Sequence, residues 1–149
     1  MRRSDMEWGL LEDSVGPRLR LVRNALVTRS IAVSEPYHLP TGSLTVLALI
    51  SANVGCSQTL IARKAGIAEP ALVGIIDQLE ERGLVRRTKS TKDRRRNDIV
   101  LTQDGESRMS SLFEAVRHIE DPIRKEIGEK AFAQLCRLLD QAISSLEEE

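Results

Sequence analysis

Aromatic residues are scarce in this sequence: one tryptophan, one tyrosine and two phenylalanines make up 3% of its 149 residues. Hydrophobic residues nevertheless account for 41%, so the interior must be built from leucine, isoleucine, valine and alanine. This composition, with few strand-like runs, favours a mainly helical protein. The length is sufficient for one domain with one moderate core. A thin helical bundle of this kind often completes its core by dimerising.

Cysteine and histidine are also scarce, with two of each. Cys56 and Cys136 lie far apart and neither belongs to a CxxC pair, which argues against a disulfide framework or a metal site. His38 and His118 have no partner at catalytic spacing, and the sequence contains no HExxH, GxSxG or glycine-rich phosphate loop. We therefore expect the protein not to be an enzyme and to bind neither a metal nor a cofactor.

Long apolar runs are missing too. No segment approaches the roughly 20 residues that a membrane span requires. The N-terminus, MRRSDMEWGLLED, carries two arginines but lacks the apolar stretch of a signal peptide. The sequence therefore predicts a soluble, cytoplasmic protein with no membrane partner.

The chain has no net charge, with 22 basic and 22 acidic residues, which by itself argues against a nucleic-acid ligand. The distribution reverses this conclusion. Residues 57–101 hold ten basic and six acidic side chains, whereas residues 102–149 hold six and eleven. Within residues 82–96, eight basic side chains accompany a single acid, Asp93. Because a phosphate backbone responds to the local field, the middle of the chain is a candidate DNA-binding region.

Apolar residues at helical spacing predict four helices in the first half of the chain. They run from Val15 to the loop around Glu35, from about Thr41 to Asn53, from Ser57 to Ala65, and from Pro70 to Gly83. Ser57 is expected to cap the third helix, and Gly66 to end it. Two short helices joined by a tight turn predict a helix-turn-helix.

After Gly83 the period changes, and Leu84–Thr88 and Asp98–Leu101 are predicted to be strands. The sequence KSTKDRRRN between them is strongly basic. A basic hairpin directly after a helix-turn-helix is typical of a wing.

A long helix is predicted after the hairpin, with Thr102 as its cap. Its apolar face carries residues from Met109 to Ile119, and Pro122 is expected to interrupt or kink it. A last helix is predicted from about Lys130.

Three segments closely resemble the MarR family of bacterial regulators: LEERGLVRR (79–87), DRRRN (93–97) and IVLTQDG (99–105). The upstream LTVLALI and CSQTLIARKAGI fit the same pattern. The resemblance covers about residues 10–145, and its most specific part is the wing segment.

This resemblance implies a fold that is mainly α with a small β-wing, in which residues 1–149 form a single domain. The winged helix-turn-helix would span residues 41–102. N- and C-terminal dimerisation helices would lie at residues 10–40 and 105–147. The resemblance also implies a homodimer with a ligand pocket between its dimerisation and DNA-binding parts.

The wing tip presents three guanidinium groups, and an arginine inserted into a narrow A·T-rich minor groove is favoured by the negative potential there. In the family's Asp-x-Arg pattern, Asp93 braces the hairpin and Arg95 reaches the groove. A basic run is often only a solvated surface, but the flanking strands and helices favour a wing. Of Arg86 and Arg87, one must point away from the core. The wing residues expected to contact DNA are Arg94, Arg95, Arg96, Lys92 and Arg86.

The second helix of the motif is expected to enter the major groove. Its first half presents Glu69, Ala71, Val73 and Gly74, and lacks the arginine, asparagine or glutamine of the commonest base contacts. Ala71 and Val73 could contact thymine methyl groups. Glu69 either accepts from a cytosine amino group or complements the helix dipole. We therefore expect the protein to recognise DNA mainly through the shape of the duplex and through phosphate contacts.

The preceding helix begins with Ser57, Gln58 and Thr59, whose amides and hydroxyls could bind a phosphate. Ser57 could equally serve only as a cap. Arg63 and Lys64 are either phosphate contacts or solvated surface residues.

An effector site is suggested by Arg20 and Arg23 on the first helix, with Tyr37 and His38 in the loop after it. Arginine suits the capture of a carboxylate. Apolar lining is expected from Leu44, Leu47 and Leu112. We therefore hypothesise a small organic anion, such as an aromatic acid or its conjugate. Alternatively, these arginines only solvate the surface or pair with the acidic tail.

The sequence as a whole predicts a ligand-responsive repressor that binds a pseudo-palindrome on double-stranded DNA. The effector must bind the two states of such a dimer with different affinity. Two alternatives stay open. A winged-helix protein-interaction module without DNA binding is favoured by the poor recognition helix. A redox sensor at Cys56 is favoured by the position of its thiol beside a helix N-terminus.

Overall fold

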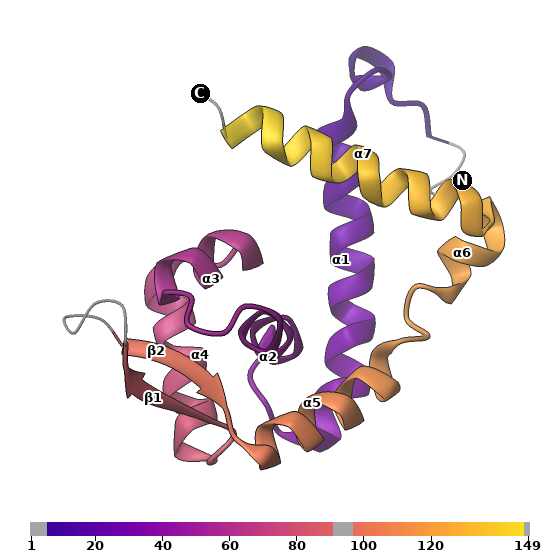
Figure 1. The fold of residues 1–149 in the computed structure, drawn as a ribbon. Coiled ribbons are helices and arrows are strands. Elements are labelled where there is room, and N and C mark those ends of the chain that lie inside the picture. Colours follow the sequence, from indigo (N-terminus) through magenta and orange to yellow (C-terminus); the bar gives the residue numbers. More distant parts are fainter. Residues whose placement is uncertain (1–5, 91–96, 148–149) are drawn as a thin grey trace. The chain divides into compact units, whose positions relative to one another are not determined.

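The computed structural model describes residues 6–90 and 97–147. Contacts among these residues divide the chain into two compact units. One unit combines the two ends of the chain, up to Ala32 and from His118 onward, and the other is Val33–Arg117. The fold is mainly α with one small antiparallel sheet, which confirms the predicted class (Figure 1).

The unit Val33–Arg117 contains five helical segments and the two strands. They are the short 3-10 helix η3 (Glu35–Tyr37), α2 (Ser43–Ala52), α3 (Gln58–Ala65), α4 (Glu69–Glu81), β1 (Val85–Lys89), β2 (Asn97–Leu101) and α5 (Gln103–Val116). Helix α2 is central, because it packs against α3, α5 and β2 (Figure 1). The core of this unit is aliphatic, as the composition predicts. Its fully buried residues include Val46, Leu47, Ile50, Ile61, Leu72, Ile76, Leu79 and Ile99.

The helix ends of this unit follow the predicted capping residues. The Ser57 hydroxyl accepts a hydrogen bond from the Leu60 amide at 3.3 Å, and Thr102 accepts one from the Gly105 amide at 3.0 Å. Gly66 ends α3 in the left-handed region, with a φ of 65° that glycine adopts without strain. Sequence-local chemistry therefore sets where α3 and α5 begin and where α3 ends.

The two strands pair in register from Val85 opposite Leu101 to Lys89 opposite Asn97. At the base of this hairpin, Leu84 joins three elements. Its amide donates to Leu79 of α4 at 2.9 Å, and its carbonyl accepts from the Thr102 amide at 3.1 Å. Helix α4, the sheet and the start of α5 thus meet at one residue.

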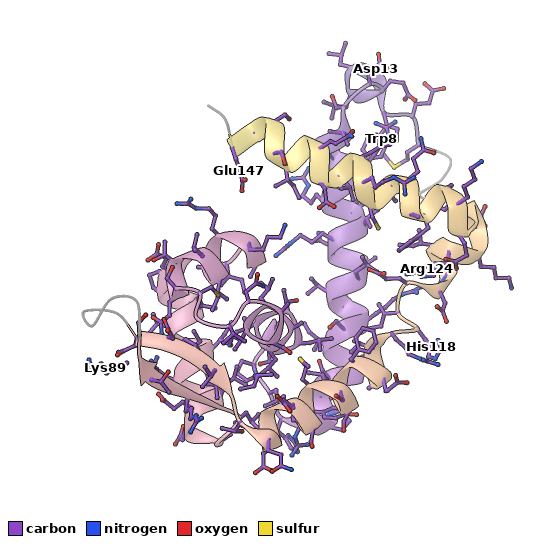
Figure 2. All side chains as sticks on the ribbon, viewed as in Figure 1. Trp8, Asp13, Lys89, His118, Arg124 and Glu147 are labelled. Atoms are coloured by element: carbon purple, nitrogen blue, oxygen red, sulfur yellow. The ribbon has the colours of Figure 1, made fainter. Side chains whose placement is uncertain are left out.

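The other unit contains most of α1 (Val15–Ser34), the 3-10 helix η2 (Gly9–Leu11), α6 (Asp121–Ile127) and α7 (Glu129–Glu147). Arg18 holds the segment before α1, since its guanidinium lies 4.7 Å from the centre of the Trp8 ring and donates to the Ser14 carbonyl at 2.8 Å. Arg124 fixes the corner between α6 and α7, because it lies over the Phe132 ring and pairs with Glu129 at 2.8 Å. Trp8 and Arg124 are labelled in Figure 2.

The predicted length of the helix after Thr102 was wrong. The helix that starts after Thr102 ends at Val116, so Ile119 lies in the connection and not on its apolar face. Pro122 lies in the first turn of α6 and does not kink a longer helix. A proline is tolerated there because the first amides of a helix have no partner within the helix.

Within the described residues, no helix combines the length and the hydropathy needed to cross a bilayer.

Candidate DNA interface

Helices α3 and α4 form a helix-turn-helix joined by a short turn after Gly66. Leu72, Ile76 and Leu79 point inward from α4 and are fully buried. This burial leaves a solvent-facing side on α4, to which Ala71, Val73 and Gln78 contribute. The arrangement is that of a helix presented to a groove and held from behind by an aliphatic core.

The residues of α4 that were predicted to contact DNA differ in their exposure to solvent. Glu69 lies in the first turn of α4 and is exposed, as are Ala71 and Val73. Gly74 is half-buried, and a Cβ added there would meet no atom within 4 Å. The outer surface at Gly74 is therefore open to a close approach of another molecule.

Of the three residues at the start of α3 that were predicted to bind a phosphate, one is exposed. Thr59 is exposed, whereas Ser57 and Gln58 are half-buried. Arg63 and Lys64 lie in the last turn of α3 and are exposed. The Ser57 hydroxyl caps the helix and can still donate its own proton.

Gln78 was not among the predicted contacts. It is exposed on α4, seven residues after Ala71, and therefore lies on the same side of the helix two turns later. A glutamine amide can form two hydrogen bonds with adenine in the major groove. The seven-residue spacing in the sequence could have identified it.

The first wing strand carries its two arginines on opposite faces. Arg86 is exposed, and the register places it opposite Val100. Arg87 lies opposite Ile99, which is buried, so Arg87 is on the core face of the sheet. Lys89 is exposed at the far end of β1 (Figure 2). Arg86 and Lys89 are therefore the described cations of the wing strand that an outside phosphate can reach.

The predicted wing-tip residues lie outside the described residues. They are Lys92, Arg94, Arg95 and Arg96, together with the bracing Asp93. Strand pairing reaches Lys89 opposite Asn97, so these residues belong to the connection between the paired ends. Their roles stay predictions.

An open pocket of about 380 Å³ lies between α2 and α5. It is lined by Leu44, Ala48, Ser51, Ala52, Met109, Ser110, Phe113 and Glu114. Of the three leucines expected to line an effector site, Leu44 does so. Leu47 and Leu112 are instead buried, with at most 2% of their surface exposed. Large aliphatic residues on α2 and α5 serve both the core and the pocket, and periodicity alone does not separate the two.

Tyr37 and His38, predicted near an effector, belong to the unit Val33–Arg117. The Tyr37 hydroxyl donates to the Ser111 carbonyl of α5 at 3.1 Å. His38 is exposed and takes a left-handed conformation with a φ of 53°. Arg20 and Arg23 lie on α1 in the other unit, where both are exposed and form no ion pair with a described residue.

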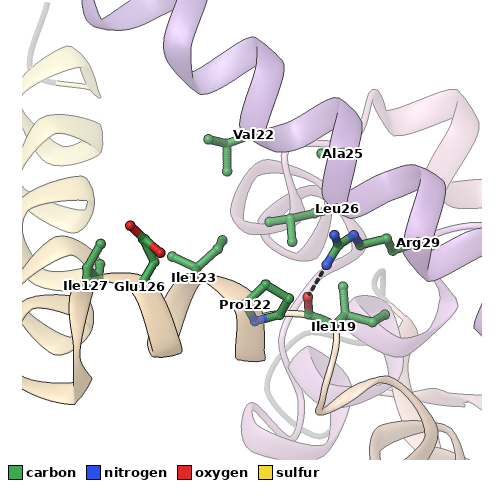
Figure 3. Close-up of a pocket in the computed structure, with 9 residues that line it drawn as sticks. All are labelled: Val22, Ala25, Leu26, Arg29, Ile119, Pro122, Ile123, Glu126 and Ile127. Carbon is green, nitrogen blue, oxygen red and sulfur yellow. Dashed lines mark hydrogen bonds between the residues drawn. The ribbon is translucent and has the colours of Figure 1, made fainter. Parts of the chain in front are cut away.

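A second pocket, of about 340 Å³, lies within the unit formed by the chain ends (Figure 3). Its walls are mostly apolar and come from α1 and from residues 119–127. Arg29 stands at its edge and donates to the Ile119 carbonyl at 3.4 Å (Figure 3).

Neither cysteine forms a disulfide: Cys56 is half-buried and Cys136 is exposed. No group of three histidine, cysteine, aspartate or glutamate side chains in the described part of the chain could hold a metal ion.

Comparison with known proteins relates this geometry to a family of regulators. Residues 39–96 match the profile of the MarR family. The HTH-type transcriptional regulator FarR of Neisseria gonorrhoeae is 29% identical over 126 residues, covering 85% of this chain and 86% of FarR.

Solved structures are similar over nearly the whole chain. The transcriptional repressor CouR bound to a 23-mer DNA duplex is 29% identical with a TM-score of 0.78, covering 93% of this chain and 98% of CouR. CouR from Rhodococcus jostii RHA1 bound to p-coumaroyl-CoA is 28% identical with a TM-score of 0.79, covering 89% and 94%. NadR in complex with 4-hydroxyphenylacetate is 26% identical with a TM-score of 0.78, covering 96% and 97%. The chain therefore carries a segment, residues 39–96, that matches the MarR family model, within a winged helix-turn-helix fold that is similar to the folds of these transcription regulators.

Proposed function

We propose that this protein is a homodimeric repressor that binds a pseudo-palindromic operator and is released by a small aromatic acid or its conjugate. The observation that carries the proposal is the placement of an exposed α4 face beside a wing strand whose Arg86 points outward. Such a pair suits the simultaneous use of a major groove and a neighbouring phosphate or minor groove. The structure of CouR on a DNA duplex supports this use.

Dimerisation is supported by apolar surface that the chain itself leaves uncovered. On α7, Phe132 is buried, while Leu135, Leu138 and Ile143 are each at least 39% exposed. On α1, Val15, Leu19 and Val22 are each at least 41% exposed. Contiguous apolar surface of this kind marks a protein interface, and a second copy of this chain is the occupant we propose.

The pocket between α2 and α5 is the proposed site for the apolar body of the effector. Its walls include Leu44, Met109 and Phe113, which suit an aromatic ring. Its described polar lining consists of serines and Glu114 and includes no cation. The described lining of this pocket therefore supplies no partner for the carboxylate. Arg20 and Arg23 are proposed as carboxylate-binding residues on the sequence pattern alone. CouR and NadR, whose structures contain p-coumaroyl-CoA and 4-hydroxyphenylacetate, support this ligand class.

The proposal is tested by selecting duplexes from a random pool with the full chain and measuring their affinity by fluorescence anisotropy. The selected sequences should contain two symmetric half-sites about 10 base pairs apart, centre to centre. They should bind two chains, and a panel of aromatic acids and their thioesters should include a compound that releases them. Failure to enrich any sequence over random duplex would contradict operator binding.

The effector part of the proposal is tested separately, by calorimetric titration of the same panel into wild type, Arg20→Ala and His38→Ala. Weaker binding in Arg20→Ala is expected if that guanidinium holds the carboxylate. Binding that is unaffected by both substitutions would remove these residues from the site and leave the DNA-binding proposal in place.

A further inference from the structure

Two adjacent arginines on the wing strand differ in what surrounds them. Arg86 makes no hydrogen bond or ion pair with a residue that the structure describes, whereas three contacts tie Arg87 to α4. The difference follows from strand alternation, which turns Arg86 outward and Arg87 toward the core face beside Ile99.

The partners of Arg87 are two acids one turn apart on α4. One terminal nitrogen, Nη2, donates to the Asp77 carboxylate at 2.6 Å, and the other, Nη1, pairs with the Glu80 carboxylate. The Arg87 backbone amide also donates to Glu80 Oε1 at 3.0 Å. Glu80 thus holds both the backbone and the side chain of one strand residue. The planar fork of arginine suits such a double contact in a way that lysine does not.

Charge and exposure agree with a structural use of Arg87. About 25% of its side chain is exposed, compared with 57% for Asp77. Partial burial alone would lower the pKa of Arg87, but hydrogen bonds and charge from Asp77 and Glu80 outweigh it and raise the pKa. The guanidinium therefore stays charged, and two carboxylates stand where a phosphate would otherwise approach.

From this geometry we infer that Arg87 is a positioning residue for DNA recognition: with Asp77 and Glu80 it fixes the wing strand against α4. The inference rests on the proposed DNA binding. A winged helix gains affinity by engaging two features of the duplex at once, so the angle between α4 and the wing must match the DNA. Three bonds between the last two turns of α4 and the middle of β1 hold that angle before DNA arrives, which lowers the ordering cost of binding.

Substitution of Asp77 or Glu80 tests this inference, because repulsion of phosphate and support of Arg87 predict opposite changes in DNA affinity. Removing an acid from a DNA-binding surface ordinarily strengthens binding, because it removes repulsion of phosphate. If Asp77 and Glu80 act through Arg87, however, Asp77→Asn and Glu80→Gln should weaken binding to the selected duplex by about tenfold. Glu81→Gln is the matched control, since Glu81 is exposed on the same turn with no described partner. It should leave affinity unchanged or raise it.

Substitutions of Arg86 and Arg87 distinguish a phosphate contact from a positioning role. Arg86→Gln should lower the slope of log affinity against log salt by about one and weaken selected and random duplexes alike. Arg87→Gln should keep the wild-type slope and weaken the selected duplex about tenfold more than the random one. A loss of slope in Arg87→Gln, or tighter binding by Asp77→Asn, would overturn the inference.

A readout without DNA keeps the inference separate from the proposed function. Amide hydrogen exchange of residues 85–89 should be faster in Arg87→Gln than in Arg86→Gln, because only the first loses the guanidinium bonds to Asp77 and Glu80. Equal exchange in the two variants would overturn the positioning role even in a protein that binds operator. Faster exchange in a protein that binds no duplex would instead reject the DNA-binding proposal and keep the contact.

Discussion

Gly105, in the first turn of α5, lies against Leu84 so closely that a Cβ at position 105 would overlap the Leu84 carbonyl oxygen and lie 2.9 Å from its carbonyl carbon. The atoms in the way are backbone, and that carbonyl is already held by Thr102. The close approach of α5 to the base of the wing therefore requires glycine at this position.

Gly105→Ala should lower the free energy of unfolding by about 3 kcal/mol, because overlap with fixed backbone forces the helix away from the strand. Thermal and urea unfolding would measure this loss. Gly16→Ala is the matched control: it also lies in the first turn of a helix, but its Cβ would meet no atom within 4 Å. It should be neutral or stabilising by up to about 1 kcal/mol. Equal stability in the two variants would contradict the close contact.

Substitutions at Ser57 separate capping from phosphate binding. Ser57→Ala should cost about 1 kcal/mol of stability, because the Leu60 amide loses its acceptor. Ser57→Asp keeps an acceptor and should preserve stability. If α3 also approaches a phosphate, however, the added negative charge should weaken DNA binding about tenfold at low salt. Unchanged DNA affinity in Ser57→Asp would leave capping as the only role of this residue.

A charge on the apolar side of α7 should disrupt the proposed dimer. Leu138 is 52% exposed, so Leu138→Glu should leave the helix content unchanged while sedimentation at micromolar concentration shifts from dimer to monomer. Ser144→Glu places the same charge on the opposite side of the helix and should stay dimeric. A wild-type protein that sediments as a monomer would contradict the dimer itself.

Filling the pocket between α2 and α5 should abolish the effector response. Ala48 lines the pocket and is exposed, so Ala48→Phe should weaken binding of a responsive aromatic acid at least about tenfold, by occupying the space of its ring. Operator affinity without effector should not change. Thr45→Phe, on an exposed α2 position outside the pocket lining, is the control. Undiminished release from the operator in Ala48→Phe would exclude this pocket.

Arg95 is predicted from sequence to reach the minor groove. Arg95→Ala should weaken operator binding by about 1–3 kcal/mol, measured by anisotropy, with circular dichroism checking that the fold is intact. The loss should be greater for A·T-rich flanks, where the narrow groove has the stronger negative potential. Equal affinities of variant and wild type would remove the wing tip from DNA recognition.

Element positions were predictable where a local residue determines them. Ser57, Gly66 and Thr102 set helix ends through hydrogen bonds and backbone conformations that involve neighbours within four residues. Pro122 misled because a proline in a helical pattern is compatible with a kink, a break or a first turn. Helix α5 ends at Val116, before Pro122, and no proline marks that end.

Contacts that need tertiary register were not predictable. Alternation required one of Arg86 and Arg87 to face outward, but it did not say which one, or that α4 would bring Asp77 and Glu80 to Arg87. The burial of Leu47 and Leu112 was missed for a similar reason, because an apolar residue on a central helix can face either a core or a pocket.

The junction at Leu84 limits how an effector can act. Both α4 and the start of α5 are hydrogen-bonded to Leu84, which directly precedes β1. We therefore expect a displacement of α5 to move α4 and the wing strand with it, without changing the angle between them. In the repressor proposed above, release by the effector is therefore expected to be a loss of avidity. We expect each copy to retain its intrinsic affinity for a half-site, and the effector to remove only the advantage of binding two half-sites together. Operator fragments with a single half-site should accordingly be bound equally well with and without the effector.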